Sequence, residues 1–189
     1  MKTFSSEDLR NIVLVGHATT GKTTLISAVL FNTKMVNRLA KVDQGNTVTD
    51  FDEDEIDKKI SIQAAVAYAH KDKYKINMID TPGFANFIWE ARFGLTAAET
   101  GLMLISATEG VEVQTEKIFD YTTELNKPLI FVVNKMTKEL ADFDNAYNSI
   151  VESFGKNVVA AQYPIGKGVD FTGIVDLIEM KAYKYSSDE

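Results

Sequence analysis

The chain has 189 residues, of which 45% are hydrophobic, so it is long enough to bury the core of one ordinary domain. Its 27 acidic residues outnumber its 20 basic ones and give a net charge of −7, which argues against nucleic-acid binding through a broadly basic surface. It has no cysteine, no signal-peptide pattern and no apolar stretch of about 18 residues, which excludes disulfides and thiolate metal sites and predicts a cytoplasmic protein without a membrane segment.

Strand and helix patterns alternate along most of the chain. Apolar or β-branched runs predict strands at 11–15, 60–69, 74–79, 102–106, 128–133 and 158–163. Apolar residues at helical spacing predict helices at 22–31, 86–98, 113–125 and 140–154. A polar turn joins the second and third strands, which predicts an antiparallel hairpin. The whole pattern predicts an α/β fold, with a mostly parallel sheet covered by helices on both faces and one antiparallel strand pair.

Residues 32–59 show no regular periodicity, and loops of that length in compact domains are usually functional or mobile. Within this segment, six of the eight residues from Asp50 to Asp57 (DFDEDEID) are carboxylates. We interpret this acidic run as a solvated charged loop.

The sequence between the first predicted strand and the first predicted helix, GHATTGKT, fits the pattern G-x-x-x-x-G-K-[ST] in full. Glycines let the backbone close around a phosphate, and the start of the following helix presents unpaired N–H groups. Lys22 is expected to reach the β and γ phosphates, and the Thr23 hydroxyl to ligate Mg²⁺. The alternative is a glycine-rich turn without a ligand. The predicted nucleotide contacts here are Gly16, His17, Ala18, Thr19, Thr20, Gly21, Lys22, Thr23 and Thr24.

A second candidate motif, IDTPGFANF, follows the predicted strand at 74–79. Asp80 stands where a second Mg²⁺ contact is expected. Taken alone, an aspartate here would more often be a helix N-cap or turn residue, and it is the phosphate loop that favours the Mg²⁺ role. Gly83 offers a backbone N–H that could touch a γ-phosphate, and glycine permits that close approach. The next residue, Phe84, can neither move a proton nor hold a water molecule.

With the further motif FVVNKMT after another apolar strand, the chain resembles the translational GTPases, and elongation factor G most closely. The resemblance rests on GHATTGKTT, GNTVTDFDEDEIDKKISI, IDTPGFANF, SATEGVEVQTEK and FVVNKM, in order and spacing over essentially the whole chain. It implies a P-loop G domain that binds GTP or GDP and Mg²⁺. It also implies a monomer that docks on the ribosome beside the sarcin-ricin loop of ribosomal RNA and the stalk proteins, and drives movement of tRNA and mRNA.

The resemblance also implies roles for particular residues. Thr23, Ser61 and Asp80 become the expected Mg²⁺ site, with Ser61 in the place of a switch I threonine that closes over the metal. The irregular segment before Ser61 becomes switch I, and Asp80 and Gly83 belong to switch II. Asn134 reads guanine O6 and N7, and Lys135 lies along the base plane. The implied nucleotide contacts beyond the phosphate loop are Asp80, Gly83, Asn134, Lys135 and Thr137.

Three positions depart from the family pattern. Phe84 replaces a histidine that positions the attacking water, and such groups contribute about 10²–10⁴-fold in rate, so hydrolysis is expected to be slow or lost and no catalytic residue is assigned. Thr137 replaces the aspartate of N-K-x-D, and its hydroxyl can satisfy only one guanine donor well, so selectivity against adenine should weaken. Glu139 could compensate. Thr19 stands where the phosphate loop commonly has aspartate, which removes a negative charge.

We therefore expect a G domain at 1–163 and, at 164–189, the truncated start of an inserted subdomain. The expected function is that of a GTPase-family translocation factor with weakened hydrolysis. The alternatives are a non-catalytic ribosome-interaction module, for protection or recycling, and an ATPase. On the predicted helix at 86–98, we expect Trp89 to pack in the core and Arg92 to form a surface salt bridge, with contact to the ribosome as the alternative for both. His17 is expected to be structural.

Overall fold

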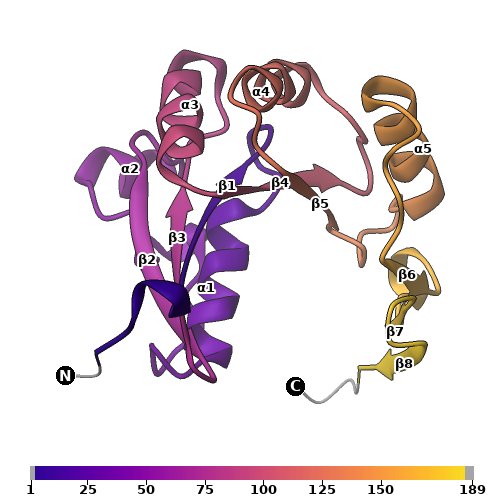
Figure 1. Cartoon of the computed structure of the whole chain (residues 1–189), viewed down its shortest axis with the longest axis horizontal. Helices are drawn as coiled ribbons and strands as arrows, with labels where there is room; N and C mark the ends of the chain where they lie inside the picture. The colour runs from indigo at the N-terminus through magenta and orange to yellow at the C-terminus, as the bar shows by residue number, and fades with distance from the viewer. Residues whose placement is uncertain (1–2, 186–189) are drawn as a thin grey trace. The chain divides into compact units, whose positions relative to one another are not determined.

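The computed structural model describes residues 3–185 (Figure 1). The chain divides into two compact units. The first comprises Met1–Leu104 and Val113–Val132, and the second comprises Ile105–Glu112 and Val133–Glu189. Among the described residues, no helix has the length and apolar character needed to cross a bilayer.

The first unit is built on a five-stranded sheet with the strand order β2-β3-β1-β4-β5. The strands are β1 Leu9–Val15, β2 Ala65–Lys71, β3 Tyr74–Asp80, β4 Thr100–Ser106 and β5 Leu129–Asn134. Strand β1 is parallel to both β3 and β4, whereas β2 is antiparallel to β3. The predicted α/β fold, mostly parallel with one antiparallel pair, is therefore confirmed.

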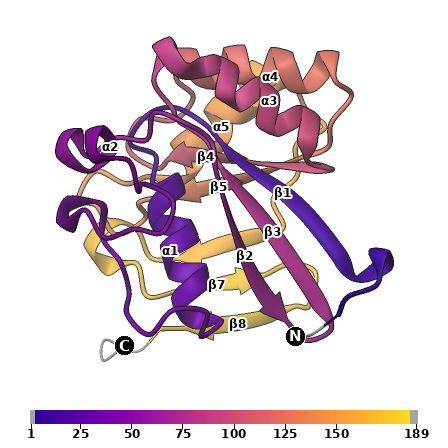
Figure 2. The same ribbon diagram turned by 90° about the vertical axis from the view of Figure 1, so that its left-hand side faces the viewer.

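Helices cover both faces of this sheet (Figure 2). They are α1 Lys22–Asn32, α3 Ile88–Ala97, which follows the 3₁₀ turn η3 Ala85–Phe87, and α4 Val113–Glu124. On one face, Leu14 and Met78 form a core with Ile26 and Leu30 of α1. On the other face, Gly94 of α3 lies so close to Val13 that an added Cβ would come within 2.7 Å of its Cγ2 atom. Neighbouring residues of a strand point to opposite faces, so each apolar strand supplies both cores.

The segment 33–64 contains two short helical elements, η2 Val42–Gln44 and α2 Glu53–Lys58. The interpretation of the acidic run as a loop is wrong, because residues 53–58 form α2, whereas four of its six carboxylates are exposed as expected and only Asp50 and Glu55 are buried. Asp52 caps α2 in a capping box with Glu55, and Glu55 is only 2% exposed. The reason is local: these carboxylates accept hydrogen bonds from backbone N–H groups that would otherwise lack partners at the start of a helix. The strand expected from residue 60 begins only at Ala65.

The second unit contains helix α5 Phe143–Phe154, capped by Asp142, and a three-stranded antiparallel sheet. Its strands are β6 Gln162–Ile165, β7 Gly173–Asp176 and β8 Lys181–Lys184, with the 3₁₀ turn η4 Gly168–Asp170 between β6 and β7. The strand expected at 158–163 is thus placed too early, because Val159 is exposed and only the residues from Gln162 pair with β7. The subdomain start at residue 164 stays a prediction, although β6 crosses it.

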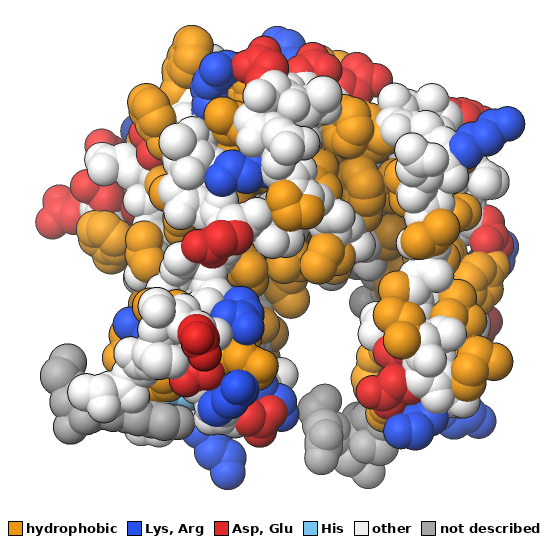
Figure 3. All heavy atoms as spheres, in the orientation of Figure 1, with side chains coloured by type: hydrophobic (Ala, Val, Ile, Leu, Met, Phe, Trp, Pro, Cys, Tyr) orange, Lys and Arg blue, Asp and Glu red, His pale blue; other side chains and the backbone are white. Residues whose placement is uncertain are grey.

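Apolar side chains lie over the small sheet (Figure 3). Val169, Ile178 and Met180 are about four-fifths exposed. The expected subdomain would end at residues 186–189, which lie outside the described part of the chain.

Candidate functional site

The phosphate loop leaves the carboxyl end of β1 next to the turn that follows β3. Leu14 of β1 pairs with Asp80 of β3 in the parallel ladder, so the two loops that continue from these strands start side by side. Ligands of open α/β sheets bind beyond the carboxyl ends of the strands. The topology therefore brings together two motifs that are far apart in the sequence.

Two glycines give the loop its path. Gly16 has φ +134° and an added Cβ would lie 2.5 Å from the Leu104 carbonyl oxygen, while Gly21 has φ +96°. Thr19 also has a positive φ, of 63°, which is rare for a β-branched residue. The loop thus holds one residue in a conformation that costs free energy, as is common where a backbone is shaped for a ligand.

Lys22 and the start of α1 provide the positive end of the loop. The Lys22 ammonium is nearly buried and donates to the carbonyl oxygens of Gly16, at 3.0 Å, and His17, at 2.9 Å. Gly21 is the N-cap of α1 and has no side chain that could accept from the first-turn N–H groups. Those N–H groups and the helix dipole favour an anion at this end.

Gly83 closes the site from the side of β3. An added Cβ would lie 2.5 Å from the backbone nitrogen of Ala18 and 2.5 Å from the Lys22 ammonium, so only glycine allows this approach. The turn is fixed by Thr81, whose buried hydroxyl donates to the Leu14 carbonyl at 2.7 Å. A phosphate held by the loop would therefore meet a backbone that is already in place.

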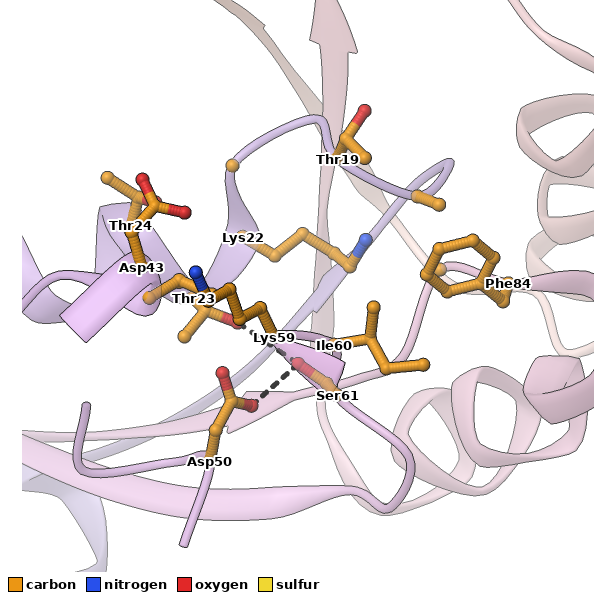
Figure 4. A pocket seen from close by; sticks show the side chains of 14 residues that line it. Thr19, Lys22, Thr23, Thr24, Asp43, Asp50, Lys59, Ile60, Ser61 and Phe84 are labelled. Atoms are coloured by element: carbon orange, nitrogen blue, oxygen red, sulfur yellow. Dashed lines mark hydrogen bonds between the residues drawn. The ribbon is translucent and has the colours of Figure 1, made fainter. Parts of the chain in front are cut away.

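Thr23 and Ser61 place two hydroxyl oxygens next to each other at the start of α1, within hydrogen-bond distance. The two oxygens are 3.2 Å apart, and the Ser61 hydroxyl donates to a carboxylate oxygen of Asp50 at 2.7 Å (Figure 4). Neighbouring ligands of an octahedral Mg²⁺, each about 2.1 Å from the ion, lie about 3 Å apart. The pair therefore fits adjacent positions around such an ion.

Asp80 supplies the carboxylate of this site and is 1% exposed. Thr49 donates to its Oδ2 atom at 2.7 Å, whereas no described residue donates a hydrogen bond of standard geometry to its Oδ1 atom. Burial raises the pKa of Asp80, and the Thr49 and Thr23 hydroxyls and the Lys22 ammonium offset this only in part. A buried carboxylate oxygen without a partner costs free energy unless a cation, or a water molecule bound to that cation, contacts it.

The donor set suits Mg²⁺ with bound phosphate. Within residues 3–185, no three histidine, aspartate or glutamate side chains gather as a metal site. Mg²⁺ is usually held by few protein ligands and completes its octahedron with phosphate oxygens and water.

A cavity of about 310 Å³ lies between these elements. Its lining comes from the phosphate loop and α1 (Ala18, Thr19, Gly21, Lys22, Thr23, Thr24), from the segment before α2 and after it (Val42, Asp43, Asp50, Lys59, Ile60, Ser61), and from the turn after β3 (Gly83, Phe84). Phe84 is 39% exposed and lines the cavity together with Ile60, so this part of the wall is apolar.

The predicted base-reading residues belong to the second unit. Asn134 ends β5, and its carbonyl accepts from the Ala107 N–H at 2.8 Å. Lys135 has φ 63° and starts a turn in which its carbonyl accepts from the Lys138 N–H at 3.0 Å. Thr137 and Glu139 are both exposed. Their contacts with a guanine base, and the compensation by Glu139, stay predictions.

Sequence reasoning missed several residues that line the cavity or lie behind its wall. Asp50 accepts a hydrogen bond from Ser61, and Thr49 donates one to Asp80, in both cases between separate segments of the chain. Lys59 and Ile60 line the cavity wall. Only the acidic run gave a signal, and it does not distinguish Asp50 from its solvated neighbours.

Two expectations for α3 have different outcomes. Trp89 is 59% exposed, so core packing is wrong for this residue; its position on α3 turns it away from the strands. The expected salt bridge of Arg92 is confirmed: its guanidinium lies 2.9 Å from Glu124 and 5.0 Å from the centre of the Tyr121 ring.

Strand, glycine-rich loop and helix, followed by an Asp-Thr-Pro-Gly turn against that loop, define a P-loop nucleotide-binding domain of the G-domain class. A model of the family "Elongation factor Tu GTP binding domain" matches residues 7–187. The chain therefore belongs to this family of translational GTPases, as a domain of the elongation factor G-like type.

Known relatives and a solved structure agree with this assignment. The chain is 36% identical to elongation factor G of Salinibacter ruber over 187 residues, covering 99% of this chain and 26% of that protein. It is 35% identical to an elongation factor G-like protein of Thermotoga maritima, covering 97% and 26%. A crystal structure from Thermus thermophilus superposes with a TM-score of 0.89 at 30% identity, covering 95% of this chain and 27% of that one. The chain thus spans about a quarter of the length of these relatives.

Proposed function

We propose that this domain binds GTP and GDP with Mg²⁺ and serves an elongation factor G-like translocation factor whose GTP hydrolysis is slow or absent. The observation that carries the proposal is the cradle formed by the phosphate loop, the Lys22 ammonium and Gly83 around one cavity. The factor acts in the cytoplasm as a monomer, with the ribosome, its sarcin-ricin loop and its stalk proteins as partners.

In this proposal the chain's own groups hold the nucleotide from three sides. The first-turn N–H groups of α1 and the Lys22 ammonium bind the phosphates, and the Gly83 N–H contacts the terminal phosphate. Thr23, Ser61 and Asp80 would hold Mg²⁺, which would neutralise charge on the phosphates when bound. Asn134 and Lys135 would contact the guanine, with Thr137 in the place of a stronger acceptor.

Phe84 is the reason for expecting slow hydrolysis. Its ring lines the cavity but offers no donor or acceptor that could orient a water molecule for attack. The phosphate cradle remains intact, so binding is retained while a factor of about 10²–10⁴ in rate is lost.

The second candidate is a non-catalytic ribosome-interaction module, in protection or recycling. Phe84 and Thr137 favour it, because both positions lack the groups that hydrolysis and guanine selection need. The exposed Trp89 and Phe93, one turn apart on α3, would offer a contact surface under either candidate.

Cosedimentation with ribosomes separates the two candidates. The proposal expects ribosome binding to be stronger with a nonhydrolysable GTP analogue than with GDP, since the terminal phosphate would order Ser61 and Gly83. Binding that is equally strong with the analogue, with GDP and without nucleotide would favour the second candidate. The absence of ribosome binding under all three conditions would contradict both.

A further inference from the structure

A lysine of the switch I segment lines the same cavity as Lys22. Lys59 is the C-cap of α2 and lies two residues before Ser61. In Figure 4 its side chain extends from this cap toward the start of α1, where Thr23 and Thr24 lie. The sequence motifs assign Lys59 no role.

The backbone that carries Lys59 is held firmly. Lys59 has φ 56°, in the left-handed region that favours glycine, and its N–H donates to the Glu55 carbonyl. On the far side of Lys59, the buried Glu55 carboxylate accepts from the N–H groups of Ile62, at 2.8 Å, and Gln63, at 3.1 Å. Lys59 itself is therefore tied to the backbone of Glu55, and the residues that follow it are tied to the Glu55 side chain. Lys59 thus keeps a conformation that costs free energy at the wall of the cavity, and residues strained in this way cluster at ligand-binding sites.

The Lys59 ammonium is available to bind a ligand in the cavity. Among the described residues it makes no ion pair or hydrogen bond, whereas its neighbour Lys58 lies 3.4 Å from Asp54. The cavity lining also contains the acids Asp43 and Asp50. A triphosphate entering here would meet these carboxylates, and one further cation on the wall would reduce the repulsion.

We propose that Lys59 is a second phosphate-binding lysine, which acts from switch I on the polyphosphate of a nucleotide held by the phosphate loop. This inference rests on the proposed function, because it requires that a nucleotide occupies the cavity. It adds a charge-assisted contact that couples nucleotide binding to the position of the switch I segment.

The test is a calorimetric titration of the protein with GTP and, separately, with inorganic tripolyphosphate, both with Mg²⁺. Lys59→Gln should weaken the binding of both ligands by about tenfold, because a charge-assisted hydrogen bond is lost and the base is not involved. Lys59→Arg should restore most of the affinity. Lys58→Gln is the matched control and should bind like the wild type, since Lys58 pairs with Asp54 outside the cavity lining.

Lys59→Gly separates a charge effect from a structural one. Glycine relieves the left-handed backbone, so this variant should be more stable than the wild type without nucleotide and yet bind GTP as weakly as Lys59→Gln. Suppose that the wild type binds GTP and that Lys59→Gln and Lys59→Gly bind it equally tightly. Lys59 then has no phosphate role, and the proposed function stands. If the wild type binds neither ligand, the proposed function and this inference fail together.

Discussion

Thr19 is a β-branched residue held at φ 63° in the middle of the phosphate loop. For such residues the left-handed conformation costs about 1–2 kcal/mol, whereas asparagine adopts it more readily. Thr19→Asn should therefore raise the free energy of unfolding of the nucleotide-free protein by about 1 kcal/mol, measured by chemical denaturation. Thr24→Asn, in α1, is the control and should bring no gain because that residue is helical. A loss of stability in Thr19→Asn would show that the threonine side chain, and not its backbone, matters at this position.

The proposed slow hydrolysis depends on Phe84. Phe84→His should raise GTP hydrolysis in the presence of ribosomes by about 10²-fold or more, because the imidazole can orient the attacking water. Phosphate release at saturating GTP measures this, and Phe84→Leu, which restores no polar group, should stay as slow as the wild type. The account of Phe84 is wrong if the wild type already hydrolyses GTP as fast as a relative with histidine at this position.

The stability of the nucleotide-free protein should depend on pH through Asp80. Its pKa is raised by burial above the ordinary value of 3.8, so the folded state binds the proton more tightly than the unfolded state does. The stability of the nucleotide-free protein should therefore fall as the pH rises from about 4 through the raised pKa. Asp80→Asn removes this dependence and should be more stable than the wild type at neutral pH, by about 1–3 kcal/mol, while losing Mg²⁺-dependent GTP binding.

Denaturation of wild type and Asp80→Asn across this pH range checks the sign. Asp57→Asn, an exposed change in α2, serves as the control and should parallel the wild type. If Asp80→Asn is less stable than the wild type at neutral pH, the Asp80 charge is compensated without a metal ion.

At the scale of elements, the switch I segment depends on the buried Glu55. Its carboxylate accepts from the N–H groups of Asp52, Ile62 and Gln63. Glu55→Gln weakens these charge-assisted bonds and should speed amide hydrogen exchange at Ile62 and Gln63 about tenfold or more, as a loss of roughly 1.5–3 kcal/mol implies. Glu53→Gln, exposed in the same helix, should leave this exchange unchanged. Equal exchange in both variants would mean that other contacts hold the segment.

The elements that form from local pattern were predictable. The strand, glycine loop and helix of residues 9–32 follow from an apolar run, a motif and helical spacing, and the structure reproduces them. The conformation of residues 50–64 was not predictable. It depends on a buried carboxylate that accepts from backbone N–H groups, whereas charge alone predicts exposure. For the candidate site, the phosphate loop and Gly83 were found by motif, whereas Thr49 and Asp50 act through contacts that only the folded chain creates.

At the scale of the whole molecule, two compact units share one chain that spans about a quarter of its relatives. The proposed phosphate and Mg²⁺ ligands all lie in the first unit, and the proposed guanine contacts lie in the second. Phosphate affinity and base selectivity should therefore respond to different substitutions. Changes at Lys22 should weaken GTP and ATP alike, whereas Thr137→Asp should strengthen GTP binding without a gain for ATP.

Calorimetric titration of the wild type and Lys22→Gln with GTP, GDP and ATP, each with Mg²⁺, tests the central claim most directly. We expect GTP and GDP to bind the wild type below millimolar concentration, ATP to bind more weakly, and Lys22→Gln to lose about tenfold to a hundredfold in GTP affinity while keeping its fold by circular dichroism. ATP binding tighter than GTP would assign the cradle to an ATPase. No heat with any nucleotide at millimolar concentration would contradict the account.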